Sequence, residues 1–162
     1  VLCGPAGSGK SAFARAHFRP TAIVSSDACR AMISDSPLNQ RVSADAFELF
    51  HCIIEKRLKW RRLAVADSTA LTRQARAQLL RIARAKGAPA TLVVFAASLE
   101  TCLRQDRARE YSVGDEVVRR QYAQLEQSLK TVRQEGFDRV YVVREGEAAE
   151  VAVGGERGSE RG

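Results

Sequence analysis

The chain has 162 residues, 45% of them hydrophobic, which is enough for one domain with a sizeable core. It contains no run of 18 apolar residues and no signal-peptide pattern, so we expect a cytoplasmic protein without a membrane partner. The net charge of +7 favours polyanionic partners. Four widely spaced cysteines fit neither a zinc site nor a small disulfide framework, and predict reduced, mostly buried thiols.

The first eleven residues read as the end of an apolar strand, a glycine-rich turn and the start of a helix. The turn fits the pattern G-x-x-x-x-G-K-[ST] of a phosphate-binding P-loop. Its residues are Gly4, Pro5, Ala6, Gly7, Ser8, Gly9, Lys10 and Ser11. Lys10 would reach the β- and γ-phosphates and the Ser11 hydroxyl would bind Mg²⁺, so ATP and Mg²⁺ are the expected ligands. The alternative is a plain glycine-rich turn.

Short apolar runs alternate with amphipathic stretches along the rest of the chain. We expect strands at 21–26, 63–66, 91–97 and 140–143. We expect helices at 11–18, 27–33, 43–60, 71–86 and, after Ser98 and the capping motif Ser112-x-x-Asp115, two more, the last ending at Gly136. Ser43 would be the N-cap of the third helix.

This alternation predicts an α/β fold of the P-loop NTPase type. Five parallel strands would form a sheet with helices on both faces and a small lid bearing arginines. Residues 1–153 would form the domain and residues 154–162 a flexible Gly-rich tail or linker. Because the sequence starts without Met inside a strand pattern, we expect it to be a segment of a longer protein.

Two carboxylates follow strands at the sheet edge where ligands bind in such folds. Asp27 comes after the second predicted strand and is the candidate group that accepts a hydroxyl proton, with a helix N-cap as its structural alternative. Arg30, three residues later, would grip an anionic group of the acceptor, or else be an exposed surface residue. Asp67 would hold Mg²⁺ through water, or else cap a loop.

The stretch Arg104–Glu110 is densely charged and predicts a lid whose arginines close over the γ-phosphate. Arg107 and Arg109 are the candidates for that contact. A solvated charged face is the alternative. His51 lies in a helical stretch, where a packing or surface role is the usual one for a histidine.

Five segments of the chain resemble the 5′-polynucleotide kinase domain of bacterial polynucleotide kinase–phosphatases. The resemblance rests on Gly4–Ser11, on S-S-D-x-x-R at residues 25–30, on V-A-D-S-T at 65–69, on V-V-R-R-Q-Y-A-Q-L at 117–125 and on E-G-F-D-R-V at 135–140. It covers the chain to about Val143. The P-loop is common to many NTPases, and S-S-D-x-x-R at this distance from it is more specific.

The resemblance implies transfer of the ATP γ-phosphate to a 5′-hydroxyl end of DNA or RNA. It implies that Asp27 is the general base, that Arg30 grips the phosphate next to the terminal nucleoside, and that Arg109 contacts the transferring phosphate. It also implies that Asp35, Gln40 and His51 lie near the acceptor groove. Partner modules with phosphatase and ligase-like activity are implied for the longer protein.

Three positions depart from the family pattern. Ala70 stands where an asparagine is usual, Asn39 stands where an aspartate is usual, and the lid is one residue shorter and lacks a second arginine. Two other functions stay open beside the polynucleotide kinase. One is a P-loop kinase of a small hydroxyl-bearing metabolite, and the other is a non-catalytic module that binds nucleotides or nucleic acid.

Overall fold

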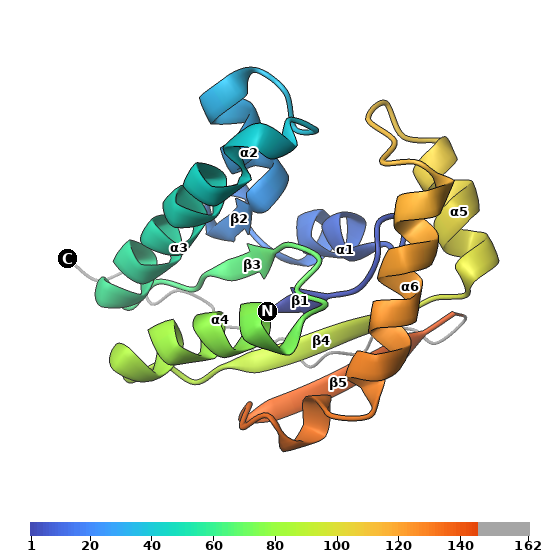
Figure 1. The fold of residues 1–162 in the computed structure, drawn as a ribbon. Coiled ribbons are helices and arrows are strands. Elements are labelled where there is room, and N and C mark those ends of the chain that lie inside the picture. The colour runs from blue at the N-terminus through green and yellow to red at the C-terminus, as the bar shows by residue number, and fades with distance from the viewer. Residues whose placement is uncertain (146–162) are drawn as a thin grey trace.

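The computed structural model describes residues 1–145, which form a parallel five-stranded sheet with helices on both faces, as the sequence predicts (Figure 1). The strands are β1 (Leu2–Cys3), β2 (Ile23–Ser25), β3 (Val65–Asp67), β4 (Thr91–Ala96) and β5 (Arg139–Arg144). They lie in the order β2-β3-β1-β4-β5, and each neighbouring pair is parallel. The predicted domain end at residue 153 and the tail from 154 lie outside the described residues.

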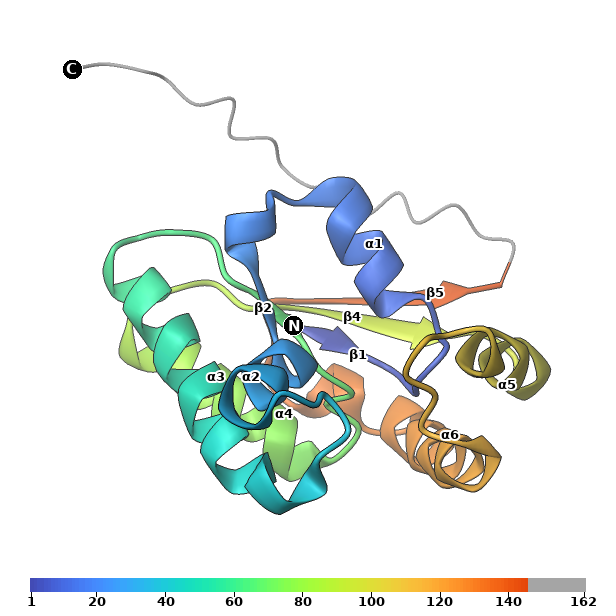
Figure 2. The ribbon, with the colours of Figure 1, turned by 90° about the horizontal axis from the view of Figure 1, so that it is seen from above.

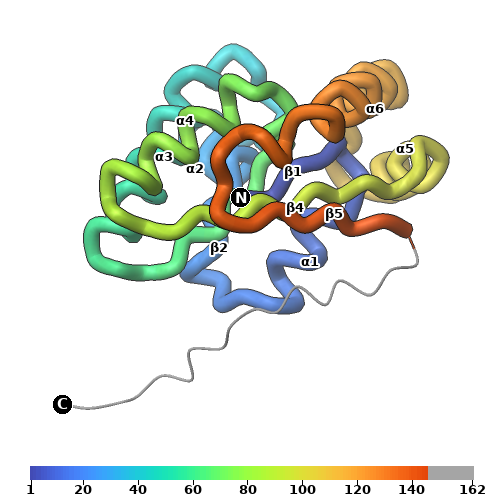
Figure 3. The backbone as a smooth tube through the Cα atoms, turned by 90° about the horizontal axis from the view of Figure 1, so that it is seen from below, coloured from blue at the N-terminus to red at the C-terminus, as the bar shows by residue number. Residues whose placement is uncertain are grey.

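The helices connect successive strands. They are α1 (Lys10–His17), α2 (Ser26–Ser34), α3 (Ser43–Lys59), α4 (Arg73–Ala85), α5 (Leu99–Arg107) and α6 (Asp115–Leu129). Short 3₁₀ turns lie at η1 (Pro20–Ala22), η2 (Gln40–Val42) and η3 (Val132–Gln134). Seen along the sheet edge, α1 covers one face, while α2, α3, α4 and α6 lie on the other and α5 lies at the end of the strands (Figures 2 and 3).

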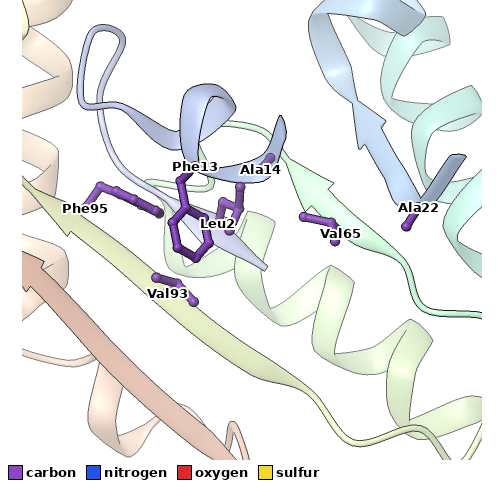
Figure 4. Close-up of a cluster of buried hydrophobic side chains, with 7 residues drawn as sticks. All are labelled: Leu2, Phe13, Ala14, Ala22, Val65, Val93 and Phe95. Carbon is purple, nitrogen blue, oxygen red and sulfur yellow. The ribbon is translucent and has the colours of Figure 1, made fainter. Parts of the chain in front are cut away.

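Strand β4, the unbroken apolar run of the sequence, is buried by helices on both of its faces. Val93 and Phe95 point to the α1 face, where they pack in a cluster with Leu2 and Phe13 (Figure 4). Leu92 and Val94 belong to a cluster on the opposite face that includes Leu125 of α6. Alternate side chains are therefore buried on both faces, as expected for a parallel sheet covered by helices.

Several predicted boundaries are wrong for local reasons. The second strand is shorter than expected because residues 20–22 form η1 and Ser25 already caps α2, accepting a hydrogen bond from the Ala28 N–H. Ser43 does not cap α3: it is the first helical residue, and its hydroxyl donates to Gln40 Oε1. The last helix ends at Leu129 rather than running on toward Gly136.

The capping motif predicted at Ser112 is also absent. Gly114 occupies the N-cap position of α6, and no side chain caps that helix. The Ser112 hydroxyl instead donates to Asp106, which belongs to α5. By contrast, Ser98 caps α5 as predicted, accepting a hydrogen bond from the Thr101 N–H.

The cysteines, all within residues 1–145, are mostly buried and form no disulfide, as the sequence predicts. Cys3, Cys29 and Cys102 are buried, Cys52 is exposed, and all are free. Within residues 1–145, the structure contains no helix with the length and apolar character needed to cross a bilayer.

Candidate functional site

The P-loop joins β1 to α1 at the carboxyl edge of the sheet. Gly9 precedes α1 with a φ of 92°, a left-handed conformation that glycine adopts without strain. Gly7, with a φ of 73°, lies so close to α5 that a Cβ there would be 2.1 Å from the Cys102 carbonyl oxygen. The Gly4 N–H donates to the Thr69 carbonyl at 2.9 Å, which ties the loop to the end of β3. The loop is therefore fixed from both sides.

Lys10 is buried and lies folded along this loop. Its Nζ donates to the Pro5 carbonyl at 2.6 Å and to Ser8 Oγ at 3.3 Å. Burial lowers the pKa of Lys10 to about 8, and the nearby Asp67 charge opposes that shift. The ammonium group is thus positioned where a phosphate bound to the loop would meet it.

Asp67 ends β3 beside the P-loop and is buried. Burial raises the pKa of its carboxyl, while a hydrogen bond from the Ser11 hydroxyl and the charge of Lys10 act to lower it. The Ser11 hydroxyl and the Asp67 carboxylate suit Mg²⁺, which in nucleotide sites binds one or two protein oxygens besides phosphates and waters. Residues 1–145 contain no cluster of three or more histidine, cysteine or acidic side chains that would hold a metal without a nucleotide.

Asp27, in the first turn of α2, is not the N-cap that the structural alternative required, because Ser25 has that role. Its carboxylate is half exposed, at 53%. Arg30 Nη1 donates to Asp27 Oδ1 at 2.7 Å, and Arg109 Nη2 lies 4.0 Å from Asp27 Oδ2. The structure therefore brings the candidate base between two guanidinium groups, one from its own helix and one from residues 108–114. These residues join α5 to α6, and we call them the lid; Arg104 and Arg107, predicted to belong to it, lie in α5.

Arg30 is not the exposed surface residue of the alternative interpretation: it is 6% exposed. Besides Asp27, its Nη1 donates to the Pro37 carbonyl at 2.9 Å, which holds the loop after α2. Its Nε is buried without a hydrogen-bond partner. Arg30 is not among the residues that line the cavity beside Asp27, so what the structure shows is that it positions Asp27 and the loop after α2.

A cavity of about 220 Å³ opens beside these charges. Its lining residues are Asp27, Ala28, Ala31, Pro37, Leu38, Arg109, Tyr111 and Val113. Helix α2 and the loop after it supply an apolar wall, and the lid supplies Arg109 and Tyr111. We call this space the acceptor cavity. It combines one acid and one cation at its rim with a largely apolar wall.

Asp106 organises the lid and was missed as a functional residue. This carboxylate is 1% exposed, yet it is partnered throughout. It accepts hydrogen bonds from Ser112 Oγ at 2.6 Å and from the Val113 and Gly114 N–H groups at 3.1 Å, and Arg109 Nη1 lies 3.6 Å away. The sequence signal was an acid on the same helix face as buried Cys102 and Leu103, followed by a short polar turn.

Helix α6 also contacts the P-loop directly. The Ala6 N–H donates to Gln121 Oε1 at 2.8 Å, across 115 residues of sequence. No sequence pattern indicated this contact, because a glutamine in a helix carries no local signature. The P-loop is thus connected to both helices that flank the lid.

A second cavity, of about 210 Å³, adjoins the P-loop through Ser8. It lies at the ends of β4 and β5, between Phe95 and Val143, with Thr101, Arg104 and Gln105 of α5 on its side. We call it the α5 cavity. It mixes aliphatic surface with amide and guanidinium groups and with the Glu145 carboxylate, which accepts a hydrogen bond from the Thr101 hydroxyl.

Four predicted site residues lie outside the group around Asp27. Arg107 makes an exposed ion pair with Asp115 of α6. Asp35 ends α2 in a left-handed conformation, and Gln40 bonds to Leu38 and Ser43 within its own loop. His51 packs its ring against Phe47 and Phe50, and burial lowers its pKa. None of them lines the acceptor cavity, and their roles stay predictions.

The sequence matches a protein family described as "AAA domain" over residues 1–132. No curated protein matches the chain. Among solved structures, a gluconokinase from Sinorhizobium meliloti 1021 is similar, with a TM-score of 0.55 and 24% sequence identity. The similarity covers 91% of this chain and 82% of that one. At this identity the likeness shows the fold alone, a five-stranded parallel sheet with a P-loop after its first strand.

Proposed function

This chain belongs to the AAA domain family, which its sequence matches over residues 1–132, and we propose that it transfers the γ-phosphate of ATP to a hydroxyl acceptor. The observation that carries the proposal is the Asp27 carboxylate. It does not cap a helix, it lies between Arg30 and Arg109, and it faces a cavity at the carboxyl edge of the sheet. A base, a cation and a phosphate-binding loop at one sheet edge are the parts that phosphoryl transfer requires.

In the proposed reaction the P-loop N–H groups and Lys10 hold the β- and γ-phosphates. Asp27 accepts the proton of the acceptor hydroxyl while the oxygen of that hydroxyl bonds to the γ-phosphorus. The bond from that phosphorus to the β–γ bridging oxygen breaks, and ADP leaves. Arg109, 4.0 Å from Asp27, supplies positive charge where hydroxyl and phosphoryl group meet. Ser11 and Asp67 are the residues that would hold Mg²⁺, which neutralises phosphate charge when bound.

The α5 cavity is our candidate site for the nucleoside part of ATP. It shares Ser8 with the P-loop, and Ala97 and Val143, at the ends of β4 and β5, give it an aliphatic side. Its amide and guanidinium groups, Gln105 and Arg104, suit the polar edge of a purine ring.

Our first candidate for the acceptor is the 5′-hydroxyl end of DNA or RNA. The resemblance through S-S-D-x-x-R supports it, and so does the chemistry of the acceptor cavity. Ala31, Pro37 and Leu38 offer an apolar wall that suits a nucleoside, whereas a highly hydroxylated sugar needs hydrogen-bond partners. The same resemblance assigns Arg30, whose Nη1 contacts Asp27 beside the cavity, to the phosphate next to the terminal nucleoside.

A small hydroxyl-bearing metabolite is the second candidate. The likeness in fold to a gluconokinase favours it, and a cavity of about 220 Å³ is large enough for a compact substrate. This reading needs the same base and the same P-loop. It differs only in what fills the space between α2 and the lid.

A panel of acceptors decides between the two. Transfer of labelled γ-phosphate is measured to a 5′-hydroxyl oligonucleotide, to a free nucleoside and to gluconate and other small polyols. We expect the oligonucleotide to give the highest kcat/KM. Faster transfer to a polyol would replace our first candidate by the second, and ATP binding without transfer to any acceptor would show a non-catalytic module.

Arg30→Ala separates the candidates further. It should raise KM for the oligonucleotide by one to two orders of magnitude, about 1.5–3 kcal/mol for a charged hydrogen bond, and change the free nucleoside much less. Arg81→Ala, at an exposed cation of α4, is the matched control. Equal losses on both acceptors would mean that Arg30 holds Asp27 and Pro37 but no substrate phosphate.

A further inference from the structure

The end of α3 and the turn after it form an exposed corner that the proposed kinase reaction does not use. Five of the eight residues 55–62 are Lys or Arg, with Glu55 as the one acid. We define the Trp60 corner as the exposed residues Lys56, Lys59, Trp60, Arg61 and Arg62. It combines an aromatic ring with four cations within seven residues.

The aromatic ring is unusually open to solvent. Trp60 is 75% exposed, and Leu63 beside it is 58% exposed. A tryptophan on a protein surface commonly packs its ring on a neighbour, because the ring is the largest apolar surface a side chain offers. Among the described residues, no ring contact involves Trp60.

The cations of the corner are not neutralised by ion pairs. Within residues 1–145, Lys56, Lys59, Arg61 and Arg62 have no carboxylate within the 4.0 Å of an ion pair. The local acid, Glu55, pairs at 2.7 Å with Lys86 at the end of α4. The corner therefore keeps four positive charges for a partner.

The backbone of the corner is fixed rather than open. The Trp60 N–H donates to the Arg57 carbonyl at 3.1 Å, and the Arg62 N–H donates to the same carbonyl at 2.9 Å. Arg57 Nε donates to the Leu63 carbonyl at 2.8 Å, so this arginine closes the turn from inside. Trp60 and its charged neighbours are thus presented by a turn with its own hydrogen bonds.

The corner lies far from the acceptor cavity. Helix α3 begins after η2, on the side of Pro37 and Leu38, and ends at the turn that leads into the start of β3 (Figure 1). Its 17 residues span about 25 Å at 1.5 Å per residue. The P-loop and Asp67 lie at the carboxyl ends of the strands, whereas the corner lies at their amino ends.

We propose that the Trp60 corner is a second binding site, which takes single-stranded nucleic acid by stacking a base on Trp60 and pairing backbone phosphates with Lys59, Arg61 and Arg62. Aromatic side chains flanked by cations bind single strands in this way without reading the sequence. The charge of the corner is complementary to a phosphate backbone and its ring to a base. An anionic bilayer matches the charge, but two exposed apolar side chains give it little to insert into.

Trp60 is the only tryptophan in the chain, so its fluorescence reports on this site alone. The probe is a 5′-phosphorylated single strand of about twelve nucleotides, within the roughly 4–16 nucleotides that such surfaces cover, added without ATP. A 5′-phosphate leaves no hydroxyl for the kinase reaction, so binding is measured apart from transfer. We expect quenching of Trp60 emission, and no quenching by a strand of the same charge that lacks bases.

Variants are compared by anisotropy of a labelled strand. Trp60→Ala should weaken binding about five-fold to a hundred-fold, and Trp60→Phe should restore most of it. Replacing Arg61 and Arg62 by Gln should reduce the slope of log affinity against log salt by about 1.4, at 0.7 per phosphate contact. The matched control replaces Arg81 and Arg133, exposed cations on α4 and η3, by Gln.

Two outcomes would overturn the proposal. Binding that survives Trp60→Ala but is lost on Asp27→Asn with Arg30→Ala would mean that the strand contacts only the acceptor cavity. A blue shift of Trp60 emission with phosphatidylserine vesicles, without quenching by the strand, would assign the corner to a membrane surface. A failure of the kinase reaction leaves this result unaffected, because the binding assay contains no ATP and no acceptor hydroxyl.

Discussion

Replacing Asp106 by Asn tests whether one buried carboxylate holds the lid in place. Asp106 accepts a hydrogen bond from the Ser112 hydroxyl and two from the Val113 and Gly114 N–H groups, and Arg109 lies 3.6 Å away. The asparagine amide keeps the shape of the carboxylate but loses its charge. Its NH₂ group cannot accept a hydrogen bond, so if it points at the Val113 or Gly114 N–H, two donors face each other. A charged hydrogen bond is worth about 1.5–3 kcal/mol, and a buried donor left without a partner costs about 1–3 kcal/mol.

We therefore expect Asp106→Asn to lower the free energy of unfolding by about 2.5–6 kcal/mol. For a protein of this length this corresponds to a fall in Tm of roughly 5–24 °C. Because Arg109 loses its neighbouring charge and Tyr111 loses a fixed turn, kcat should also fall. Thermal unfolding followed by circular dichroism measures the first effect. Hydrogen exchange of the Val113 and Gly114 amides measures the opening of the lid itself.

The control makes the same chemical change at an exposed site. Asp115 pairs with Arg107, and both side chains are well exposed, so Asp115→Asn should leave Tm close to that of the wild type. If Asp106→Asn is as stable as Asp115→Asn, and its lid amides exchange no faster than in the wild type, then Asp106 does not organise the lid.

Two further predictions concern the P-loop. Gly7→Ala should abolish ATP binding, because the new Cβ would lie 2.1 Å from the Cys102 carbonyl oxygen. The control is Gly87→Ala, which has a φ of 62° and no atom within 4 Å of the new Cβ, and should cost only about 1–2 kcal/mol of backbone strain. Calorimetric titration with ATP compares the two variants, and ATP binding by Gly7→Ala would contradict the packing argument. ATP affinity should also fall as the pH rises through about 8, because burial lowers the pKa of Lys10 to about 8 and only the protonated amine attracts phosphate. The Lys10→Arg variant keeps its charge over this range. An equal decline of ATP affinity in that variant would mean that another group titrates.

Much of the fold could be predicted because it depends on local patterns. The P-loop motif, the apolar run of β4 and the stop at Gly87 each follow from residues within one element. The errors arise where a side chain finds a partner outside its own segment. Ser43 and Ser112 read as helix caps, yet their hydroxyl groups donate to Gln40 and Asp106 instead.

The site divides in the same way. Asp27 and Arg30 share a helical turn, so their spacing already predicted a common surface. Gln121 lies 115 residues from the P-loop, and the chain near it gives no sign of the hydrogen bond to Ala6. The roles of Asp106 and Gln121 depend on how α5 and α6 pack against the loop. Such packing is decided by the whole fold rather than by a motif.

The most direct test of the account is single-turnover transfer of labelled γ-phosphate to a 5′-hydroxyl oligonucleotide, comparing wild type with Asp27→Asn. We predict transfer by the wild type and a loss of at least a hundred-fold in the variant, the low end for removal of a general base. ATP affinity of the variant should stay within a few-fold of the wild type, because the P-loop is unchanged. Wild-type rates in Asp27→Asn, or no transfer by folded wild-type protein with Mg²⁺, would contradict the assignment of Asp27 as the base of a polynucleotide kinase.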